Sequence, residues 1–525
     1  MIVSETELDT PRTPPLPATT VVAVIGAGAM GAGIAQIAAA AGHPVKLLDN
    51  RAGAAAAAVD SIRSMFSKLA SKGRMSAEEA AAASARLQAV EQLPALADAG
   101  LVIEAIIEKL DIKQQLFSDL EAVVSRDCLL ATNTSSISVT SIGAALKHPD
   151  RLAGLHFFNP APLMALVEVI SGLATERQVA DTLYATAEAW GKTPVHARST
   201  PGFIVNRVAR PYYAEALRVL NEGGGDCATL DALMRECGGF RMGPFELMDM
   251  IGHDVNFAVT RSVWNAFFND PRFSPSLIQQ ELVDAGFYGR KSGRGFYDYR
   301  DGAPAIEARS AVEQKVPSDI ILHGQSPAAH ALGDRLFDQG ISYHWSEDSN
   351  SGVDGRIAEA GGAVIYVTDG RSATQRAAET GVQNLVVIDL ALDYGTASRI
   401  AVGAAINAWA PAIGAAIGML QAAGFAVSRL NDIPGLMVMR TVAMLANEAA
   451  DAVNQGVCDS RGADAAMRLG VNYPRGPLEW ADRVGLPVIG GVLANLNRFY
   501  GEDRYRVSPL IQQHVHAGTQ IHASR

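Results

Sequence analysis

The stretch that decides the fold is Val21-Val-Ala-Val-Ile-Gly-Ala-Gly-Ala-Met-Gly31. A short β-branched run leads into three glycines, and an apolar-periodic segment that ends at Ala41 follows. This order of strand, glycine turn and helix predicts a turn that binds a pyrophosphate, because the unpaired N–H groups at the start of the helix face the anion. We therefore expect a dinucleotide cofactor to contact Gly26, Gly28, Met30 and Gly31.

The residue that ends the next strand indicates which cofactor binds. Asp49 follows the strand Val45 to Leu48, about 20 residues after the turn, where its carboxylate would accept hydrogen bonds from the adenosine ribose and repel a 2′-phosphate. The sequence therefore favours NAD over NADP, and Arg51 weakens that preference. A glycine turn used only for packing is the alternative, which the agreement of strand, turn, helix and acid disfavours.

Further strands extend this unit along the chain. Leu101–Ile103 and Leu129–Ala131 have the composition of buried strands, and Asp111–Val124 between them is helical in pattern, which is typical of a doubly wound parallel sheet. We predict a disordered leader over 1–19, a Rossmann-type α/β NAD-binding domain over 20–199, and an all-α domain over 200–303.

A repeat with a constant offset of 233 residues organises the rest of the chain. The matched pairs are Pro201-Gly202 with Pro434-Gly435, Glu215-Ala216 with Glu448-Ala449, Met234-Arg235 with Met467-Arg468, Gly243-Pro244 with Gly476-Pro477, Asp249 with Asp482, and Leu277-Ile-Gln-Gln280 with Leu510-Ile-Gln-Gln513. Accidental similarity does not keep register over about 80 positions. We therefore predict a second all-α domain over 433–525 that repeats residues 200–286.

Between the two helical copies, strand and helix patterns alternate again. The strand candidates are Ile320–His323, Val364–Val367, Leu385–Ile388 and Phe425–Ser428, after a linker over 303–317. They predict a second, degenerate Rossmann-like domain over 315–432. Its first strand leads into His323-Gly-Gln-Ser-Pro327, which has one glycine where the first turn has three, so we expect no nucleotide there.

Composition excludes several classes of protein. The chain has 525 residues, of which 48% are hydrophobic and 19% charged, and its net charge is -11 without a basic run, so a nucleic-acid partner is not expected. Four cysteines without a C-x-x-C pair favour a reducing, cytoplasmic location, and the absence of an acid/His cluster at ligand spacing predicts no metal. The uncharged stretch from Ile400 to Ser428 is long enough for a membrane span, but its Ala, Gly and Pro content favours a core helix and a buried strand.

Two polar residues in apolar surroundings are the candidates for chemistry. His156 ends a predicted strand in Gly154-Leu-His-Phe-Phe-Asn-Pro160, and Glu168 interrupts the apolar run Leu166-Val-Glu-Val-Ile170. If the chain returns antiparallel after Pro160, Glu168 lies beside His156 and could orient it as a base that takes a hydroxyl proton. Each residue alone has a plainer interpretation, a core histidine bonded to backbone or a glutamate at a sheet edge.

Several motifs together resemble the L-3-hydroxyacyl-CoA dehydrogenases. They are Gly26-x-Gly-x-x-Gly31-Ala-Gly-Ile, Asn133-Thr-Ser-Ser, His156-Phe-Phe-Asn-Pro, Pro201-Gly-Phe-Ile-Val-Asn-Arg207, Gly243-Pro-Phe-Glu-Leu-Met-Asp249 and Lys291-Ser-Gly-Arg-Gly-Phe-Tyr297, in family order over residues 20 to about 300. The second sheet and second helical copy look like the long bacterial members assigned to phenylacetate or 3-hydroxybutyryl-CoA metabolism.

The resemblance implies NAD-dependent, reversible oxidation of an L-3-hydroxyacyl-CoA. It makes His156 the general base, Glu168 its orienting partner, and Ser135 and Asn206 the donors that polarise the reacting oxygen. It implies further cofactor contacts at Glu108, Lys113, Asn133, Ser135, Asn159 and Lys291. Lys68 and Lys72 are candidates for binding the CoA phosphates, and a purely solvated helix charge is an equal alternative for them.

The second copy departs from this pattern. Met439 stands 233 residues after Asn206, and the Lys291-Ser-Gly-Arg-Gly-Phe-Tyr297 string has no counterpart, so we expect one site per chain. Because helical domains pair two subunits in this family, we expect the second copy to pack on the first within one chain, in a monomer or a homodimer. The acyl chain, 3-hydroxybutyryl or 3-hydroxyadipyl, stays open.

Two other classes of protein share the glycine turn. One is a catalytically silent NAD-binding or lens-crystallin-like relative, which would not need His156, Glu168, Ser135 and Asn206 together. The other is a hydroxyacid or 6-phosphogluconate-type dehydrogenase, which uses a lysine base that this arrangement does not place.

Overall fold

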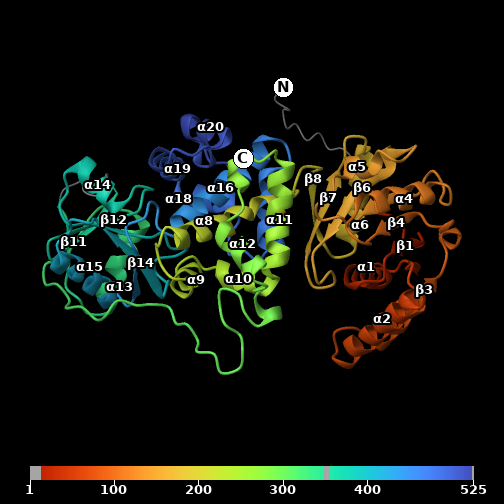
Figure 1. Ribbon diagram of the computed structural model, residues 1–525, viewed down its shortest axis with the longest axis horizontal. Coiled ribbons are helices and arrows are strands. Elements are labelled where there is room, and N and C mark those ends of the chain that lie inside the picture. Colours follow the sequence, from red (N-terminus) through yellow and green to blue (C-terminus); the bar gives the residue numbers. More distant parts are fainter. Residues whose placement is uncertain (1–12, 348–351, 353–354, 523–525) are drawn as a thin grey trace. The chain divides into compact units, whose positions relative to one another are not determined.

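The computed structural model describes residues 13–347, 352 and 355–522. The described residues form two compact units, one within 13–205 and 456–471 and one within 206–455 and 472–522 (Figure 1). The part of the expected leader that precedes residue 13 lies outside the described residues.

The first unit is built on an eight-stranded sheet of order β3-β2-β1-β4-β5-β6-β7-β8. Its strands are β1 Val22–Ile25, β2 Val45–Leu48, β3 Leu87–Val90, β4 Leu101–Glu104, β5 Leu129–Thr132, β6 Leu152–Phe157, β7 Leu166–Ser171 and β8 Thr193–Arg198. Neighbouring strands are parallel except β6 and β7, which run antiparallel. The predicted parallel strands are therefore present, and the chain reverses where the two prolines after His156 required a turn.

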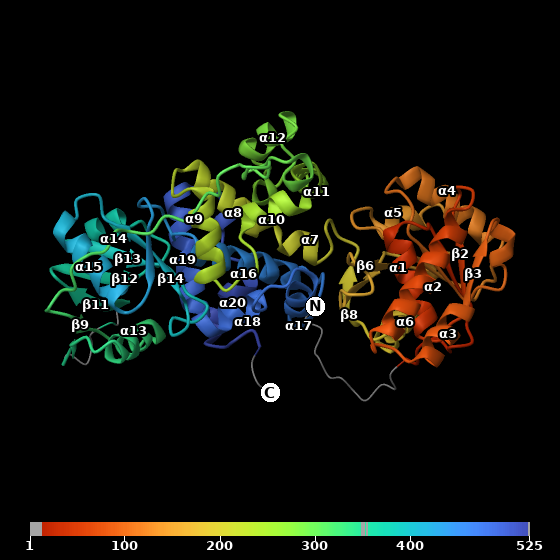
Figure 2. The same cartoon turned by 90° about the horizontal axis from the view of Figure 1, so that it is seen from below.

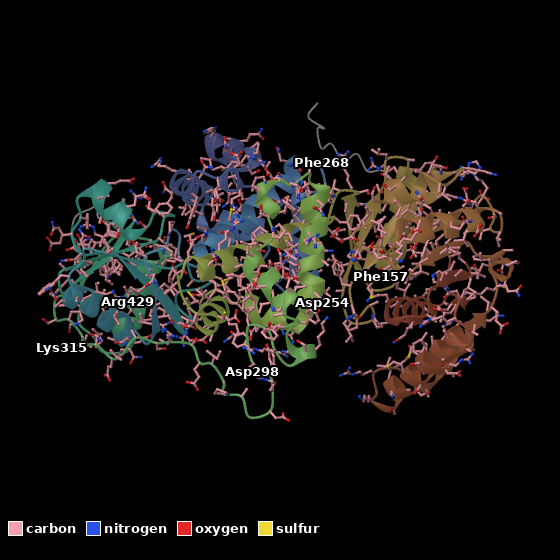
Figure 3. The ribbon with its side chains drawn as sticks, in the orientation of Figure 1. Phe157, Asp254, Phe268, Asp298, Lys315 and Arg429 are labelled. Carbon is pink, nitrogen blue, oxygen red and sulfur yellow. The ribbon has the colours of Figure 1, made fainter. Side chains whose placement is uncertain are left out.

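Helices cover the sheet of the first unit on both faces. They are α1 Ala29–Ala40, α2 Ala54–Ser71, α3 Ala77–Ala85, α4 Leu110–Glu121, α5 Val139–Gly143 and α6 Arg177–Ala189. Helices α1, α2, α3 and α6 share one buried core with the sheet, and Figure 1 shows α4 and α5 on the side away from α1 and α2. Phe157, labelled in Figure 3, is 2% exposed and stacks on Trp190 in this core.

A helix from the second copy also belongs to the first unit. Helix α17, Ser460–Gly470, packs on β7 and β8. The backbone N–H of Arg198 donates to the carbonyl of Val457, just before the helix. A Cβ at Gly470 would lie 2.7 Å from a terminal methyl carbon of Leu166, so a larger residue would require this leucine to shift. The sequence repeat did not predict that this segment would join the first sheet.

The second unit contains a mixed sheet of order β10-β9-β11-β12-β13-β14-β15. Its strands are β9 Ile321–Leu322, β10 His344–Trp345, β11 Arg356–Ala360, β12 Ala363–Val367, β13 Leu385–Ile388, β14 Arg399–Ala404 and β15 Ala426–Arg429, with helices α13 Pro327–Asp338, α14 Ala373–Thr380 and α15 Ala410–Ala422. The four predicted strands are present. The sheet is less parallel than a complete Rossmann domain, because β11 and β12 form a hairpin across Gly361-Gly362, where both residues have positive φ.

The stretch with the composition of a membrane span is part of this sheet and its helix. Residues 400–428 form β14, α15 and β15, with α15 and both strands largely buried. Across the described residues, every helix is too short or too polar to span a bilayer.

The remaining helices follow the repeat. The first copy has α7 Val205–Val208, α8 Arg210–Asn221, α9 Cys227–Glu236, α10 Pro244–Ile251, α11 His253–Ala266 and α12 Leu277–Asp284, and the second has α16 Val438–Asn454, α17, α18 Pro477–Val484, α19 Leu486–Tyr500 and α20 Pro509–Ala517. Backbone geometry keeps the same register. Gly202 and Gly435 have φ of 75° and 74°, and Phe203 and Leu436 have φ of 48° and 50°.

The two copies pack on each other through α8 and α16, which lie side by side in Figures 1 and 2. Arg207 Nε lies 2.6 Å from Glu448 Oε1, and Arg440 Nε lies 2.7 Å from Glu215 Oε2. Arg440 and Glu448 stand 233 residues after Arg207 and Glu215, so the two buried ion pairs are exchanged copies of one contact. This reciprocity is the pattern of a two-fold interface, formed here within one chain.

Candidate active site

The antiparallel return of the chain brings together the two candidate catalytic residues. In the register of β6 and β7, His156 lies directly opposite Glu168. His156 Nδ1 is 2.7 Å from Glu168 Oε2, and both side chains are buried. Because an ionised carboxylate can only accept, Nδ1 donates its proton and Nε2 carries the free electron pair. This is the orientation that a base acting through Nε2 requires.

The second oxygen of Glu168 is also fully used. Oε1 accepts hydrogen bonds from the backbone N–H groups of Ile204 and Val205, at 2.9 and 3.0 Å. The carboxylate therefore anchors the backbone directly before Asn206 as well as the imidazole. Such satisfaction is what a carboxylate with 0% exposure needs, since an unpaired buried charge is strongly unfavourable.

Aromatic rings enclose His156. Phe158 and Phe203 have ring centroids 4.5 and 5.9 Å from the imidazole centroid. Nε2 makes no hydrogen bond with any described residue, and the residue as a whole is 6% exposed. The nitrogen that would receive a proton is thus not used inside the protein.

The glycine turn fits a dinucleotide. Gly26 has φ of 105°, and a Cβ on it would lie 2.4 Å from the carbonyl oxygen of Ala105, while a Cβ at Gly31 would lie 1.8 Å from the carbonyl oxygen of Gly26. Gly28 differs, because a Cβ there would meet no protein atom within 4 Å. Gly28 is the N-cap of α1 without a side-chain cap, so the helix start, which includes Met30, offers its N–H groups to an anion outside the chain.

Asp49 holds this turn from the end of β2. Its Oδ2 accepts the N–H of Ala27 at 2.7 Å, and Arg51 contacts both carboxylate oxygens through its side chain. The hydrogen bond from Arg51, joined by the N–H groups of Ala27 and Arg51, lowers the pKa of Asp49 to about 2. The carboxylate is therefore fully charged at neutral pH, as recognition of a ribose requires.

Glu108 organises the loop that follows β5. Its Oε1 accepts hydrogen bonds from the N–H groups of Ser135 and Ser136 and from the hydroxyl of Thr134. Burial raises the pKa of Glu108, but these donors and Lys113 outweigh burial, so the pKa lies below the usual value. Thr134 and Ser136 were not expected to contribute, although the polar run after Asn133 is a sequence signal for a structured loop.

Three other predicted cofactor residues are Lys113, Asn133 and Asn159. Lys113 is 1% exposed and forms ion pairs with Glu104 at 2.6 Å and with Glu108 at 3.2 Å. Its ammonium group is therefore paired with carboxylates inside the protein. Asn133 Oδ1 accepts the N–H of Phe157 and ties the end of β5 to the end of β6. Asn159 is exposed just beyond β6.

The remaining predicted residues lie elsewhere. Lys68 and Lys72 are exposed at the end of α2, with no carboxylate of the described residues within ion-pair distance. Lys291 forms an ion pair with Asp254, which is labelled in Figure 3, at 2.5 Å. Asn206, on α7, and Lys291 belong to the second compact unit, and their parts in the site stay predictions.

The second sheet keeps the register of the His156–Glu168 pair but not its residues. Asp389 stands 233 residues after His156, and Ala401, 233 residues after Glu168, accepts its N–H. The carboxylate of Asp389 instead accepts the N–H groups of Met437, Val438 and Met439. One dyad per chain follows for the described residues, and the fixed offset could have revealed this replacement from sequence alone.

Comparison with protein families decides between the classes that share a glycine turn. The model of the 3-hydroxyacyl-CoA dehydrogenase NAD-binding domain matches residues 21–200, and the model of the C-terminal domain of the same enzymes matches residues 202–299 and 435–524. The chain belongs to the 3-hydroxyacyl-CoA dehydrogenase family. It is an NAD-dependent oxidoreductase that acts on a 3-hydroxyacyl-CoA. A third model, the reduced Rossmann-fold domain of 3-hydroxybutyryl-CoA dehydrogenase, matches residues 365–434.

Two members of this family match nearly the whole chain, and a shorter one matches about its first half. The chain is 46% identical to the 3-hydroxyadipyl-CoA dehydrogenase of Escherichia coli K12 over 492 residues, which cover 94% of this chain and 96% of the relative. The crystal structure of a 3-hydroxybutyryl-CoA dehydrogenase from Escherichia coli K12 superposes with a TM-score of 0.86 at 43% identity, and the match covers 95% of this chain and 98% of that one. The 3-hydroxybutyryl-CoA dehydrogenase of Bradyrhizobium diazoefficiens is 40% identical over 283 residues, 54% of this chain and 96% of the relative.

Proposed function

We propose that His156 is the general base of this dehydrogenase and that Glu168 orients it. The observation that carries the proposal is the 2.7 Å contact between Nδ1 and Oε2, which leaves Nε2 as the acceptor. Bound NAD+ supplies the hydride acceptor. His156 Nε2 takes the proton of the C3 hydroxyl as hydride leaves C3, so the substrate loses two electrons and two hydrogens and becomes a 3-oxoacyl-CoA. In the reverse direction the imidazolium returns the proton.

Glu168 stabilises the imidazolium that forms during oxidation. The carboxylate lies against the ring in a buried site, where a charge-assisted hydrogen bond is stronger than in water. Its bonds to Ile204 and Val205 prevent it from rotating away. Proton transfer of this kind contributes typically about 10² to 10⁴ to the rate.

Ser135 and Asn206 complete the proposed site as donors to the reacting oxygen. Ser135 is exposed at the end of β5, and its backbone is fixed by Glu108. Asn206 directly follows the segment that Glu168 anchors. Their donors would stabilise negative charge that develops on the oxygen at C3 or on the thioester carbonyl. Lys68 and Lys72 are proposed to meet the CoA phosphates.

We also propose the finer points that the relatives support. Their names favour 3-hydroxyadipyl-CoA or 3-hydroxybutyryl-CoA as substrate. The four cysteines form no disulfide, which supports a reducing, cytoplasmic location. The exchanged ion pairs of α8 and α16 already form a two-fold contact inside one chain, which supports either a monomer or a dimer built through another surface.

The direct test is reduction of a 3-oxoacyl-CoA by NADH. The purified full-length chain should oxidise NADH only when acetoacetyl-CoA or a longer 3-oxoacyl-CoA is added. A catalytically silent relative would bind NADH without turnover, and a hydroxyacid dehydrogenase would act on free acids lacking CoA. Turnover of the free acid at the rate of the thioester would contradict the proposal.

A further inference from the structure

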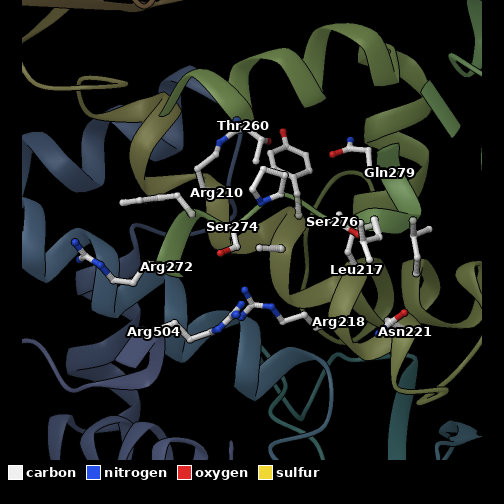
Figure 4. A pocket seen from close by; sticks show the side chains of 16 residues that line it. Arg210, Leu217, Arg218, Asn221, Thr260, Arg272, Ser274, Ser276, Gln279 and Arg504 are labelled. Atoms are coloured by element: carbon white, nitrogen blue, oxygen red, sulfur yellow. The ribbon is translucent and has the colours of Figure 1, made fainter. Parts of the chain in front are cut away.

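A pocket in the second unit has an unusual charge. It has a volume of about 210 Å³ and is lined by residues of α8, α11, α12 and the segment between the last two helices, together with Arg504 from the turn between α19 and α20. Four arginines line it, and none of its lining residues is acidic. Figure 4 shows Arg210 beside Thr260 along one edge, with Arg218 and Arg504 together on the opposite side. The pocket is therefore suited to an anion.

Three of these arginines have carboxylate partners inside the protein. Arg218 contacts Glu215 at 3.0 Å, Arg272 contacts Asp451 at 2.6 Å, and Arg504 contacts Glu502. The fourth, Arg210, is 5% exposed and has no carboxylate of the described residues within ion-pair distance.

The contacts of Arg210 are all neutral. Nε donates to the carbonyl of Asn206 at 2.8 Å, Nη1 donates to the hydroxyl of Thr260 at 3.1 Å, and the guanidinium lies over the ring of Tyr213. Nη2 makes no hydrogen bond with the described residues. Burial lowers the pKa of this guanidinium. A buried cation held in this way calls for an anion that the chain itself does not supply.

The position of Arg210 relates this pocket to the proposed substrate. Arg210, the first residue of α8, follows Asn206 of α7 by four residues, and Ala209 between the two helices has helical φ and ψ. Arg210 Nε donates to the carbonyl of Asn206, so the two residues are neighbours on successive turns, about 6 Å apart along the axis. In a six-carbon acyl chain, three C–C bonds of about 1.5 Å separate C3 from a carboxylate at C6. An oxygen at C3 near Asn206 therefore puts that carboxylate within reach of Arg210.

We propose that Arg210 is a specificity-determining residue that binds the terminal carboxylate of a dicarboxylic 3-hydroxyacyl-CoA with a six-carbon acyl chain. The inference rests on the proposed function, because it uses Asn206 as the contact of the C3 oxygen. Nη2 and Nη1 form the fork that meets the two carboxylate oxygens, and Thr260 holds the guanidinium plane. Leu217 and Phe273 line the same pocket and would contact the methylene groups.

The test compares two substrates of equal chain length that differ only at the end. NADH-dependent reduction of 3-oxoadipyl-CoA and of 3-oxohexanoyl-CoA is measured with the wild-type chain and with Arg210→Met, Arg210→Lys and Thr260→Val. The wild type should prefer the carboxylate-ended substrate by about tenfold or more in kcat/KM. For Arg210→Met, kcat/KM with 3-oxoadipyl-CoA should fall by about 50-fold or more, mainly because KM rises. With 3-oxohexanoyl-CoA, kcat/KM should stay within about threefold of the wild-type value.

Controls separate a binding role from a structural one. Arg210→Lys keeps the charge, so its KM for 3-oxoadipyl-CoA should lie between those of the wild type and Arg210→Met. Thr260→Val keeps Arg210 and should lower the preference for 3-oxoadipyl-CoA by a smaller factor than Arg210→Met does. Arg218→Met removes a pocket arginine that already has a carboxylate partner and should change both substrates equally.

Two results would overturn the inference. If the wild type has the same kcat/KM for both substrates, the pocket does not bind the terminal carboxylate. If Arg210→Met lowers kcat/KM equally for both substrates, the guanidinium serves a part that they share, such as CoA or the helix itself. A wild-type chain that reduces neither substrate would refute the proposed function and this inference with it, whereas turnover of 3-oxohexanoyl-CoA without selectivity would refute this inference alone.

Discussion

Asp389 occupies in the second sheet the register position that His156 occupies in the first. His156 lies opposite Glu168, and Asp389 lies opposite Ala401, at the same offset of 233 residues. In both sheets a carboxylate accepts the N–H groups at the start of the first helix of the adjoining helical copy. Glu168 accepts those at the start of α7, and Asp389 accepts those at the start of α16. The second copy thus has no imidazole at this pair, and its carboxylate stands at the position of His156 rather than at that of Glu168. The shared contacts imply that Glu168 has a structural task beside its proposed catalytic one.

The structural task predicts the effect of Asp389→Ala. Asp389 has 0% exposure and satisfies the N–H groups of Leu390, Met437, Val438 and Met439, which would be left without a partner. The variant should lose about 3 kcal/mol or more of stability, seen as a lower midpoint in thermal unfolding, with kcat unchanged below that midpoint. Asp393→Ala, at an exposed position of the same unit, should shift stability by less than about 0.5 kcal/mol. Equal thermal unfolding midpoints for the two variants would show that the hydrogen bonds of Asp389 do not stabilise the fold.

The catalytic task predicts the effect of Glu168→Gln. The amide oxygen can still accept from Ile204 and Val205, but the amide nitrogen would then face Nδ1 and donate to it. This favours the imidazole tautomer with its proton on Nε2, which cannot act as a base. We expect kcat to fall by about 10² to 10⁴ while the unfolding midpoint changes little. Glu168→Ala should lower both quantities, and a Glu168→Gln enzyme with wild-type kcat would exclude the orienting role.

Asp49 predicts how cofactor binding depends on pH. Arg51 holds the pKa of Asp49 at about 2, below the value of about 4 for an unfolded chain, so its charge is lost only as the pH falls through about 2. NAD+ affinity, followed by fluorescence titration, should therefore not change through Asp49 between about pH 5 and pH 8. Asp49→Ser should weaken NAD+ binding and narrow the preference for NAD over NADP, because the repulsion of a 2′-phosphate is removed. Unchanged selectivity would assign cofactor choice to another residue.

The exchanged ion pairs predict the behaviour of a shortened chain. A protein that ends after residue 305 keeps Arg207 and Glu215 but lacks Glu448 and Arg440, so two buried charges and the apolar face of α8 are exposed. We expect this protein to be insoluble or to self-associate, measured by light scattering coupled to size-exclusion chromatography. A well-behaved active monomer would contradict the view that the second copy replaces a dimer partner.

Much of this arrangement could be predicted from local sequence signals. The glycine turn predicted the first βαβ unit because its strand, turn and helix are adjacent in the chain. The spacing of His156 and Glu168 predicted their pairing because only one antiparallel turn separates them. The repeat predicted the second helical copy because its landmarks keep one offset.

Other features depend on contacts between distant segments. Helix α17 joins the first sheet rather than its own copy, and the hairpin of β11 and β12 makes the second sheet mixed, neither of which is visible in a local pattern. The isolation of Arg210 could not be foreseen either. It is apparent only in the structure, where every other arginine of the pocket has a carboxylate partner. The partners of Arg272 in the second copy lie 176 or more residues away in the chain. The buried ion pair of Lys113 with Glu104 could likewise not be predicted from the spacing of residues in the sequence.

In the proposed mechanism, Nε2 of His156 accepts the proton from the C3 hydroxyl. The most direct measurement is kcat for oxidation of a 3-hydroxyacyl-CoA by His156→Ala, taken together with the dissociation constant of NAD+ and with His196→Ala, an outer histidine on β8, as control. We predict that His156→Ala loses about 10² to 10⁴ in kcat with NAD+ affinity unchanged, while His196→Ala keeps wild-type turnover. A His156→Ala enzyme that retains kcat within about tenfold of the wild type would contradict this account.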